Sequence, residues 1–191
     1  MSAHPDVEAA ARRMAVLVAA VPDEALTRRT PCERYTVGDL LDHIGGSALA
    51  FTAAAVKNPR EGGPSGDARR LGPDWRSRIP RDLEALGEAW RDPEAWNGIT
   101  AAGGVDLPGE VAGVVALDEL VLRGWDLARA TGQSVEYEHS ELEAVHGMVQ
   151  HLRADGVEGL FGPPVPVPDH APLLDRMLGL AGRDPAWEPV R

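Results

Sequence analysis

The sequence predicts an all-α fold, a bundle of four main helices with accessory short helices and long loops. Three observations lead to this prediction. Apolar residues recur at helical spacing in several stretches, proline and glycine separate these stretches, and no alternation of apolar and polar residues is long enough for a sheet. The 191 residues suffice for one sizeable core but not for two ordinary domains, so we expect a single domain over residues 1–191.

The first two predicted helices have clear boundaries. Apolar residues at helical spacing over residues 7–21 predict one helix, which Pro22 ends. Thr36 is a good N-cap for a second helix that continues to about Val56. Asp39 lies three residues after Thr36, so the two side chains are expected to form a capping box.

Proline defines the expected third helix. Residues 58–80 mix glycine, proline and arginine without periodicity, which predicts a long surface loop. Pro80 is suited to the first turn of a helix, and Pro93 is expected to end that helix. Residues 96–108 are weakly patterned and predict either a short hairpin or an extended loop.

The second half of the chain begins with the strongest helical pattern, over residues 109–131, followed by a glycine C-cap. Ser140 and Glu143 have capping-box spacing and predict the start of a fifth helix. The proline-rich residues 161–172 must be extended, and residues 173–180 predict a last short helix.

Composition excludes several classes of partner. The net charge of −11 and the absence of a clustered basic face argue against nucleic acid. No apolar run approaches the roughly 20 residues that a bilayer requires, so we expect no membrane span and a cytoplasmic protein. The single cysteine, Cys32, cannot form an internal disulfide; it is either a packed thiol or a thiol activated by the helix that begins nearby.

Candidate site residues lie on two of the predicted helices. His43 falls at the edge of an apolar stripe, where it either bonds a backbone carbonyl or Asp39, or serves as a metal ligand. Asp118 falls within an apolar stripe of the helix over residues 109–131, so Asp118 or its neighbour Glu119 should meet a cation or a metal. Glu119 and Arg123 also have the spacing of an ordinary ion pair on a helix surface.

Three blocks of sequence resemble one protein family. They are TPCERYTVGDLLDHIGG at residues 30–46, LRGWDLARATG at 122–132 and FGPPVPVPDHAPLLDRMLGLAGRDPAW at 161–187. Together they resemble actinobacterial proteins related to the N-terminal domain of mycothiol-dependent maleylpyruvate isomerase, within the DinB-like superfamily. The resemblance implies a DinB-like four-helix bundle in which three residues hold a divalent metal, often zinc or nickel.

The resemblance assigns roles to individual residues. His43 matches the first metal ligand and Glu119 the second, but Arg123 stands where the third ligand, a histidine, is expected. A guanidinium donates hydrogen bonds and does not ligate metals. Arg123 then either fills the vacated metal position beside Glu119, leaving His43 as an acid–base group, or Asp118 or His170 completes a weaker metal site.

Three functions remain open from the sequence. The first is a metal-dependent, thiol-linked transferase or isomerase of the mycothiol type with a degenerate metal site, in which His43 and Arg123 are catalytic and a small molecule or thiol is the substrate. The second is a non-catalytic bundle that has lost the metal and binds a small anion or regulates another protein. The third makes the pocket vestigial and the protein a homodimer through exposed helix faces.

Overall fold

Helices dominate the computed structural model, which describes residues 4–59, 65–154 and 161–189. The α-helices are α1 (Val7–Ala19), α2 (Val37–Ala55), α3 (Trp75–Ala89), α4 (Gly109–Thr131), α5 (His139–Ala154) and α6 (Leu173–Leu180). The shorter elements are the 3-10 helices η1 (Asp23–Ala25), η2 (Ala68–Arg70) and η3 (Pro93–Trp96), and the strands β1 (Ile99–Ala102) and β2 (Val105–Pro108).

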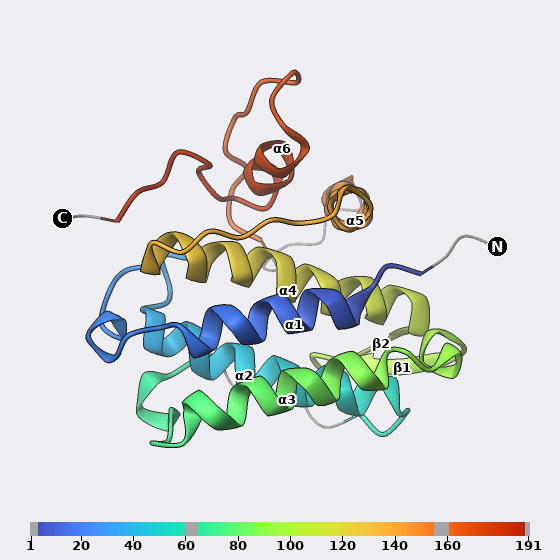
Figure 1. Ribbon diagram of the computed structural model, residues 1–191. Helices are drawn as coiled ribbons and strands as arrows, with labels where there is room; N and C mark the ends of the chain where they lie inside the picture. Colours follow the sequence, from blue (N-terminus) through green and yellow to red (C-terminus); the bar gives the residue numbers. More distant parts are fainter. Residues whose placement is uncertain (1–3, 60–64, 155–160, 190–191) are drawn as a thin grey trace.

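The first four α-helices form a bundle; α5 crosses the outer side of α4 at a steep angle, and α6 packs against α5 (Figure 1). Each helix of the bundle packs against two others: α1 and α2 each contact both α3 and α4. The predicted all-α, DinB-like bundle with accessory helices is confirmed. No helix among the described residues is both long enough and apolar enough to cross a bilayer.

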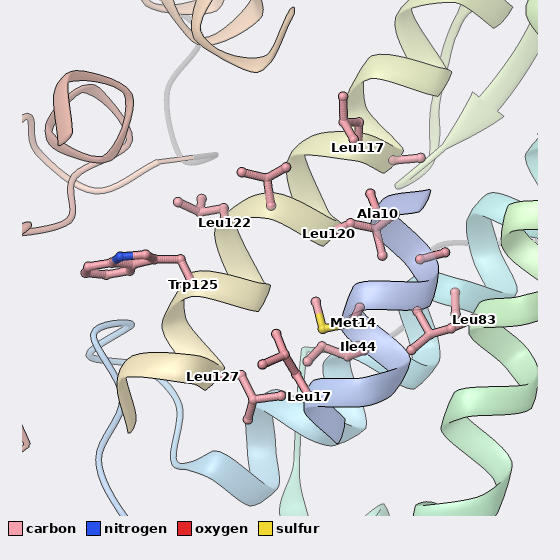
Figure 2. Packing of buried hydrophobic residues seen from close by; sticks show 14 of the residues in the cluster. Ala10, Met14, Leu17, Ile44, Leu83, Leu117, Leu120, Leu122, Trp125 and Leu127 are labelled. Atoms are coloured by element: carbon pink, nitrogen blue, oxygen red, sulfur yellow. The ribbon is translucent and has the colours of Figure 1, made fainter. Parts of the chain in front are cut away.

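Helix α4 is buried on both sides because it separates the bundle from the outer layer. On one side Leu120 and Leu127 lie beside Ala10 and Leu17 of α1, while Trp125 extends away from the bundle (Figure 2). This position explains why α4 has a broad apolar surface rather than one narrow stripe. Three charged residues of α4, Asp118, Arg123 and Asp126, are therefore buried in contact with protein instead of water.

The capping box predicted for α2 is present. The hydroxyl of Thr36 accepts from the backbone N–H of Asp39 at 3.3 Å, and the Asp39 carboxylate accepts from the backbone N–H of Thr36 at 2.9 Å. Two N–H groups that the first turn leaves without helical partners are thereby satisfied. This cap fixes the start of α2 about two turns before His43.

The predicted start of the third helix at Pro80 was wrong. Helix α3 begins at Trp75, because the apolar stripe continues before the proline through Trp75 and Ile79, both buried. The backbone N–H groups of Ser77 and Arg78 bond to the carbonyl of Asp74 at 3.0 and 2.9 Å. Pro80 lacks an N–H, but the loss of one bond near the helix start is outweighed by this burial.

Two other local predictions are resolved. Residues 96–108 contain a hairpin, in which β1 and β2 pair antiparallel around Gly103 and Gly104, both at positive φ. The predicted cap at Ser140 was wrong, since α5 begins at His139 and Ser140 lies inside it. Glu141 caps this end instead, because its carboxylate accepts from the backbone N–H of Glu138 at 3.0 Å.

Candidate functional site

A histidine and a carboxylate meet between α2 and α4. Nε2 of His43 lies 2.8 Å from Oε2 of Glu119, and the two side chains are 20% and 21% exposed. The predicted place of His43 at the edge of the buried face of α2 agrees with this exposure. The suggested bond to Asp39 was wrong, because the Asp39 carboxylate already accepts from Thr36 and from the backbone N–H of Ala68.

Arg123 completes a buried cluster around the same carboxylate. Its Nε donates to Oε2 of Glu119 at 3.3 Å, while its Nη1 lies 3.6 Å from Oδ2 of Asp126 and 3.8 Å from Sγ of Cys32. The side chain is about 8% exposed. The Glu119–Arg123 pair is therefore not an ordinary helix-surface ion pair, because α2 and the loop that carries Cys32 cover it.

The electrostatics of the cluster keep both partners charged. Burial acts to raise the pKa of Glu119, but the charge of Arg123 and the hydrogen bond from His43 lower it more, so the net pKa is well below its usual range. Burial acts to lower the pKa of Arg123, but Glu119 and Asp126 raise it more. At neutral pH the site holds a carboxylate and a guanidinium in direct contact.

The ionised state of Glu119 fixes the tautomer of His43. A carboxylate only accepts hydrogen bonds, so Nε2 of the imidazole must carry the proton that it shares with Glu119. In the neutral ring Nδ1 is then the basic nitrogen. Within the described residues no hydrogen bond engages Nδ1.

The surface around His43 is built from two neighbouring segments. The ring of Tyr35 lies against that of His43, with 5.3 Å between ring centres. The backbone N–H of Gly66 donates to the Tyr35 hydroxyl at 3.3 Å. Gly66 approaches α2 so closely that a side chain there would overlap the carbonyl of Asp39. Tyr35 and Gly66 thus form a fixed edge beside the imidazole.

The space beneath the pair is almost filled. A cavity of about 10 Å³ lies between the bundle helices, with Ser47, Glu119 and Arg123 on its polar side and Phe51 and Leu83 among its apolar walls. This is room for roughly one water molecule. A substrate would therefore contact the outer edge of His43 and Glu119 rather than enter the bundle.

The other acidic and histidine candidates lie elsewhere. Asp118 is one residue before Glu119, so its side chain leaves α4 in a different direction; it is buried, and its Oδ1 has no hydrogen-bond partner among the described residues. Burial raises the pKa of Asp118 to about 7. His170 is exposed ahead of α6, and no hydrogen bond or ion pair between described residues joins it to His43.

The donor set does not fit a three-ligand divalent metal. Of the three positions that the resemblance assigns to ligands, two hold residues with suitable atoms, His43 and Glu119, and the third holds the cationic guanidinium of Arg123. No group of three histidine, cysteine, aspartate or glutamate residues within the described ranges is arranged to hold a metal ion. Metal ligation by His43 and Glu119 stays a prediction.

Sequence reasoning missed two residues of the cluster. Asp126, three residues after Arg123, was visible as a second acidic neighbour on the same face of α4. Arg183, which donates to Asp126 from the segment after α6, lies 57 residues away, and no local pattern indicated it. The period of a helix shows which of its residues share a face, but it does not show which distant segments contact that face.

Comparisons with known proteins agree with the fold. The structure is similar to the crystal structure of the mycothiol-dependent maleylpyruvate isomerase, with a TM-score of 0.63 and 15% identity over 81% of this chain and 71% of that one. Two uncharacterized proteins of Mycobacterium tuberculosis, from strains CDC 1551 / Oshkosh and ATCC 25618 / H37Rv, are each 27% identical over 88% of this chain and 91% of their own length.

The match to a family model covers the bundle and the candidate site. Residues 7–128 match the model of the mycothiol maleylpyruvate isomerase N-terminal domain, which is more than half of the chain. The matched range includes His43, Glu119 and Arg123. The chain belongs to the mycothiol maleylpyruvate isomerase N-terminal domain family.

Proposed function

We propose that this protein is a mycothiol-linked transferase or isomerase in which His43 and Arg123 act without a metal. The observation that carries the proposal is the ionised Glu119 carboxylate, which contacts the imidazole at 2.8 Å and the guanidinium at 3.3 Å. A carboxylate that orients an imidazole is a common arrangement for general base catalysis. Family membership supplies the thiol as the substrate class.

The proposed chemistry begins with a proton transfer. Nδ1 of His43 accepts the proton of a thiol bound at the outer edge of the pair, and Glu119 stabilises the resulting imidazolium. In a transfer reaction the thiolate sulfur then forms a bond to an electron-poor carbon of a second small molecule, the bond from that carbon to its leaving group breaks, and the leaving group takes the electron pair and receives the proton from His43. In an isomerisation the thiolate adds to a conjugated carbon–carbon double bond, whose π electrons move onto the conjugated group; these electrons re-form the double bond when the carbon–sulfur bond breaks, and the departing thiolate recovers the proton from His43.

Arg123 has a supporting electrostatic role in this proposal. Its guanidinium lies beside Glu119 and keeps that carboxylate ionised, so Glu119 stays an acceptor for Nε2 of His43. Two carboxylates, Glu119 and Asp126, already balance its charge. The alternative of a small-anion site, which needs a cation with uncompensated charge, is therefore less well supported by the geometry.

The test measures thiol transfer from mycothiol to a chromogenic electrophile, before and after treatment with a chelator. We expect turnover that survives chelation, and a loss of at least about a hundredfold in His43→Ala, the usual contribution of a general base. His139→Ala is the matched control, because His139 is an exposed histidine on α5. Activity that disappears with the chelator, or that is unchanged in His43→Ala, contradicts the proposal.

Elemental analysis of the same preparations tests the metal directly. We expect no stoichiometric zinc or nickel in the wild type, and a gain of bound metal in Arg123→His, which supplies the missing imidazole beside His43 and Glu119. Stoichiometric metal in the wild type that is lost in His43→Ala would restore the metal-dependent hypothesis. Mycothiol or anion binding without any turnover would instead favour the non-catalytic bundle.

Other expectations about the protein stay predictions. They are a single domain over residues 1–191, a homodimer, a cytoplasmic location, and a small molecule or thiol rather than nucleic acid as the partner. Exposed apolar side chains at Val16, Ile99 and Val105 are the places where a dimer contact is most readily sought. Light scattering of the purified protein decides between monomer and dimer.

A further inference from the structure

The segment after α6 reaches the candidate site through a buried ion pair. Arg183 donates to both oxygens of Asp126, from Nε to Oδ1 at 3.3 Å and from Nη2 to Oδ2 at 3.0 Å. Asp126 is fully buried, and Arg183 is 6% exposed. The same Oδ2 also lies 3.6 Å from Nη1 of Arg123. One carboxylate is therefore shared by a guanidinium of α4 and one from the C-terminal segment.

The backbone after α6 is shaped to deliver Arg183. Gly182 has a φ of +76°, which reverses the chain at the end of α6. The backbone N–H of Arg183 then donates to the carbonyl of Leu178 at 2.8 Å, and its Nη1 donates to the carbonyl of Ala181 at 3.1 Å. The guanidinium is thus held by its own turn as well as by Asp126, which limits the positions it can adopt.

The contact between Arg183 and Asp126 compensates a buried negative charge. A fully buried carboxylate needs compensation, and Asp126 has two cationic partners among the described residues, Arg123 and Arg183. Without Arg183, Arg123 alone of these two cations would compensate the negative charge of Asp126. Its guanidinium would then be drawn toward Asp126 and away from Glu119, since the two carboxylates compete for the same cation.

We propose that Arg183 is a positioning residue for the candidate site: by neutralising Asp126 it leaves Arg123 free to hold Glu119 against His43. The chain of contacts runs from Arg183 through Asp126, Arg123 and Glu119 to His43, and the polar atoms of each link lie 3.6 Å apart or closer. Arg183 lies outside residues 7–128 that match the family model. The effect of Arg183 on catalysis rests on the proposed function, whereas its effect on the position of Arg123 does not.

The experiment follows the Nε–H group of Arg123 by NMR, without any substrate. This proton is bonded to Glu119, so its exchange with water reports whether the guanidinium stays in place. In Arg183→Gln we expect the exchange rate to rise about tenfold, the effect of losing one hydrogen bond of ordinary net strength. Arg123→Lys assigns the resonance by removing it.

Arg129→Gln is the matched control for general loosening. Arg129 also joins α4 to the C-terminal segment, by donating from Nε to the carbonyl of Trp187 at 3.1 Å, but no hydrogen bond or ion pair among the described residues joins it to Asp126. We expect its loss to leave the exchange of the Arg123 proton unchanged. An unchanged rate in Arg183→Gln, or an equal rise in Arg129→Gln, overturns the proposal.

A conservative variant keeps the test usable if Arg183→Gln does not fold. Arg183→Lys retains the charge but cannot span both oxygens of Asp126, so we expect an intermediate rise of about threefold. If Arg183→Gln does not fold, an unchanged exchange rate in Arg183→Lys overturns the proposal. These exchange rates are measured without a thiol. They therefore test the role of Arg183 even if the protein turns out not to be an enzyme.

Discussion

One substitution changes the chemistry of the whole pocket at the scale of single residues. We predict that a histidine at position 123 would make Glu119 one of three metal-ligating side chains. With Arg123, the same carboxylate is the counter-ion of a guanidinium and the acceptor for His43. We therefore expect the identity of one side chain to decide whether the cation in the pocket is a metal or a part of the protein.

Asp118 is the residue whose removal should change the pH dependence of stability. Its pKa is about 7 in the folded protein, raised by burial from an ordinary value of 3.8. The folded state therefore binds a proton that the unfolded state has lost, so the free energy of unfolding falls as pH rises from about 4 to about 7. In Asp118→Asn we expect this fall to disappear, which makes the variant roughly 2–4 kcal/mol more stable than the wild type at pH 8.

Urea unfolding at pH 4 and pH 8 measures this difference. Asp106→Asn, on the exposed side of the hairpin, is the control and should shift neither value. Equal stabilities of Asp118→Asn and wild type at pH 8 would show that the Asp118 carboxylate is ionised without cost in the folded protein, in contradiction to its burial.

The elements were predicted well where a repeating pattern defines them. The apolar stripes of α1, α2, α4 and α6 fixed their positions within a few residues, since burial on one face determines both sequence and structure. The start of α3 was predicted wrongly at Pro80, because proline favours the first turn of a helix. The buried apolar residues before Pro80 extend the helix to an earlier start. Bringing His43, Glu119 and Arg123 into one pocket needed the family resemblance, because spacing along the chain does not show which helices are neighbours.

Gly182 is the residue on which the turn after α6 depends. Its φ of +76° is unfavourable for other residues, and a Cβ there would lie 2.7 Å from the backbone of Gly162. In Gly182→Ala we expect a loss of about 2–3 kcal/mol in the free energy of unfolding. Chemical unfolding monitored by circular dichroism measures the loss.

A second glycine serves as the control for this change. Gly147 lies within α5, where a Cβ would meet open space, so Gly147→Ala should stabilise the protein by about 0.5–1 kcal/mol. If Gly182→Ala were equally harmless, the turn would not require the left-handed conformation, and the delivery of Arg183 would have another cause.

The whole molecule consists of a bundle and an outer layer that are joined by charge as well as by apolar packing. Arg13 of α1 pairs with Glu141 of α5, and Glu141 is almost completely buried. The ring of Tyr137 lies 5.7 Å from the guanidinium carbon of Arg13. Contacts of this kind connect segments more than a hundred residues apart, so they could not be predicted from local sequence.

Breaking this pair should weaken the docking of the outer layer. Arg13→Met leaves the carboxylate of Glu141 buried without its cation, and we expect a loss of about 3–5 kcal/mol in the free energy of unfolding. The double variant Arg13→Met, Glu141→Met should recover much of that loss, because no uncompensated charge remains. Equal losses in the single and double variants would mean that apolar packing, not charge, carries the connection.

The buried Cys32 gives the molecule a natural mass label. It is the only cysteine in the chain, and its sulfur lies 3.8 Å from Arg123. Any disulfide-linked adduct that forms when the protein meets an oxidised thiol must therefore sit at the site itself. The modified fraction in one intact mass spectrum then measures how accessible Cys32 becomes to the thiol, with no peptide mapping.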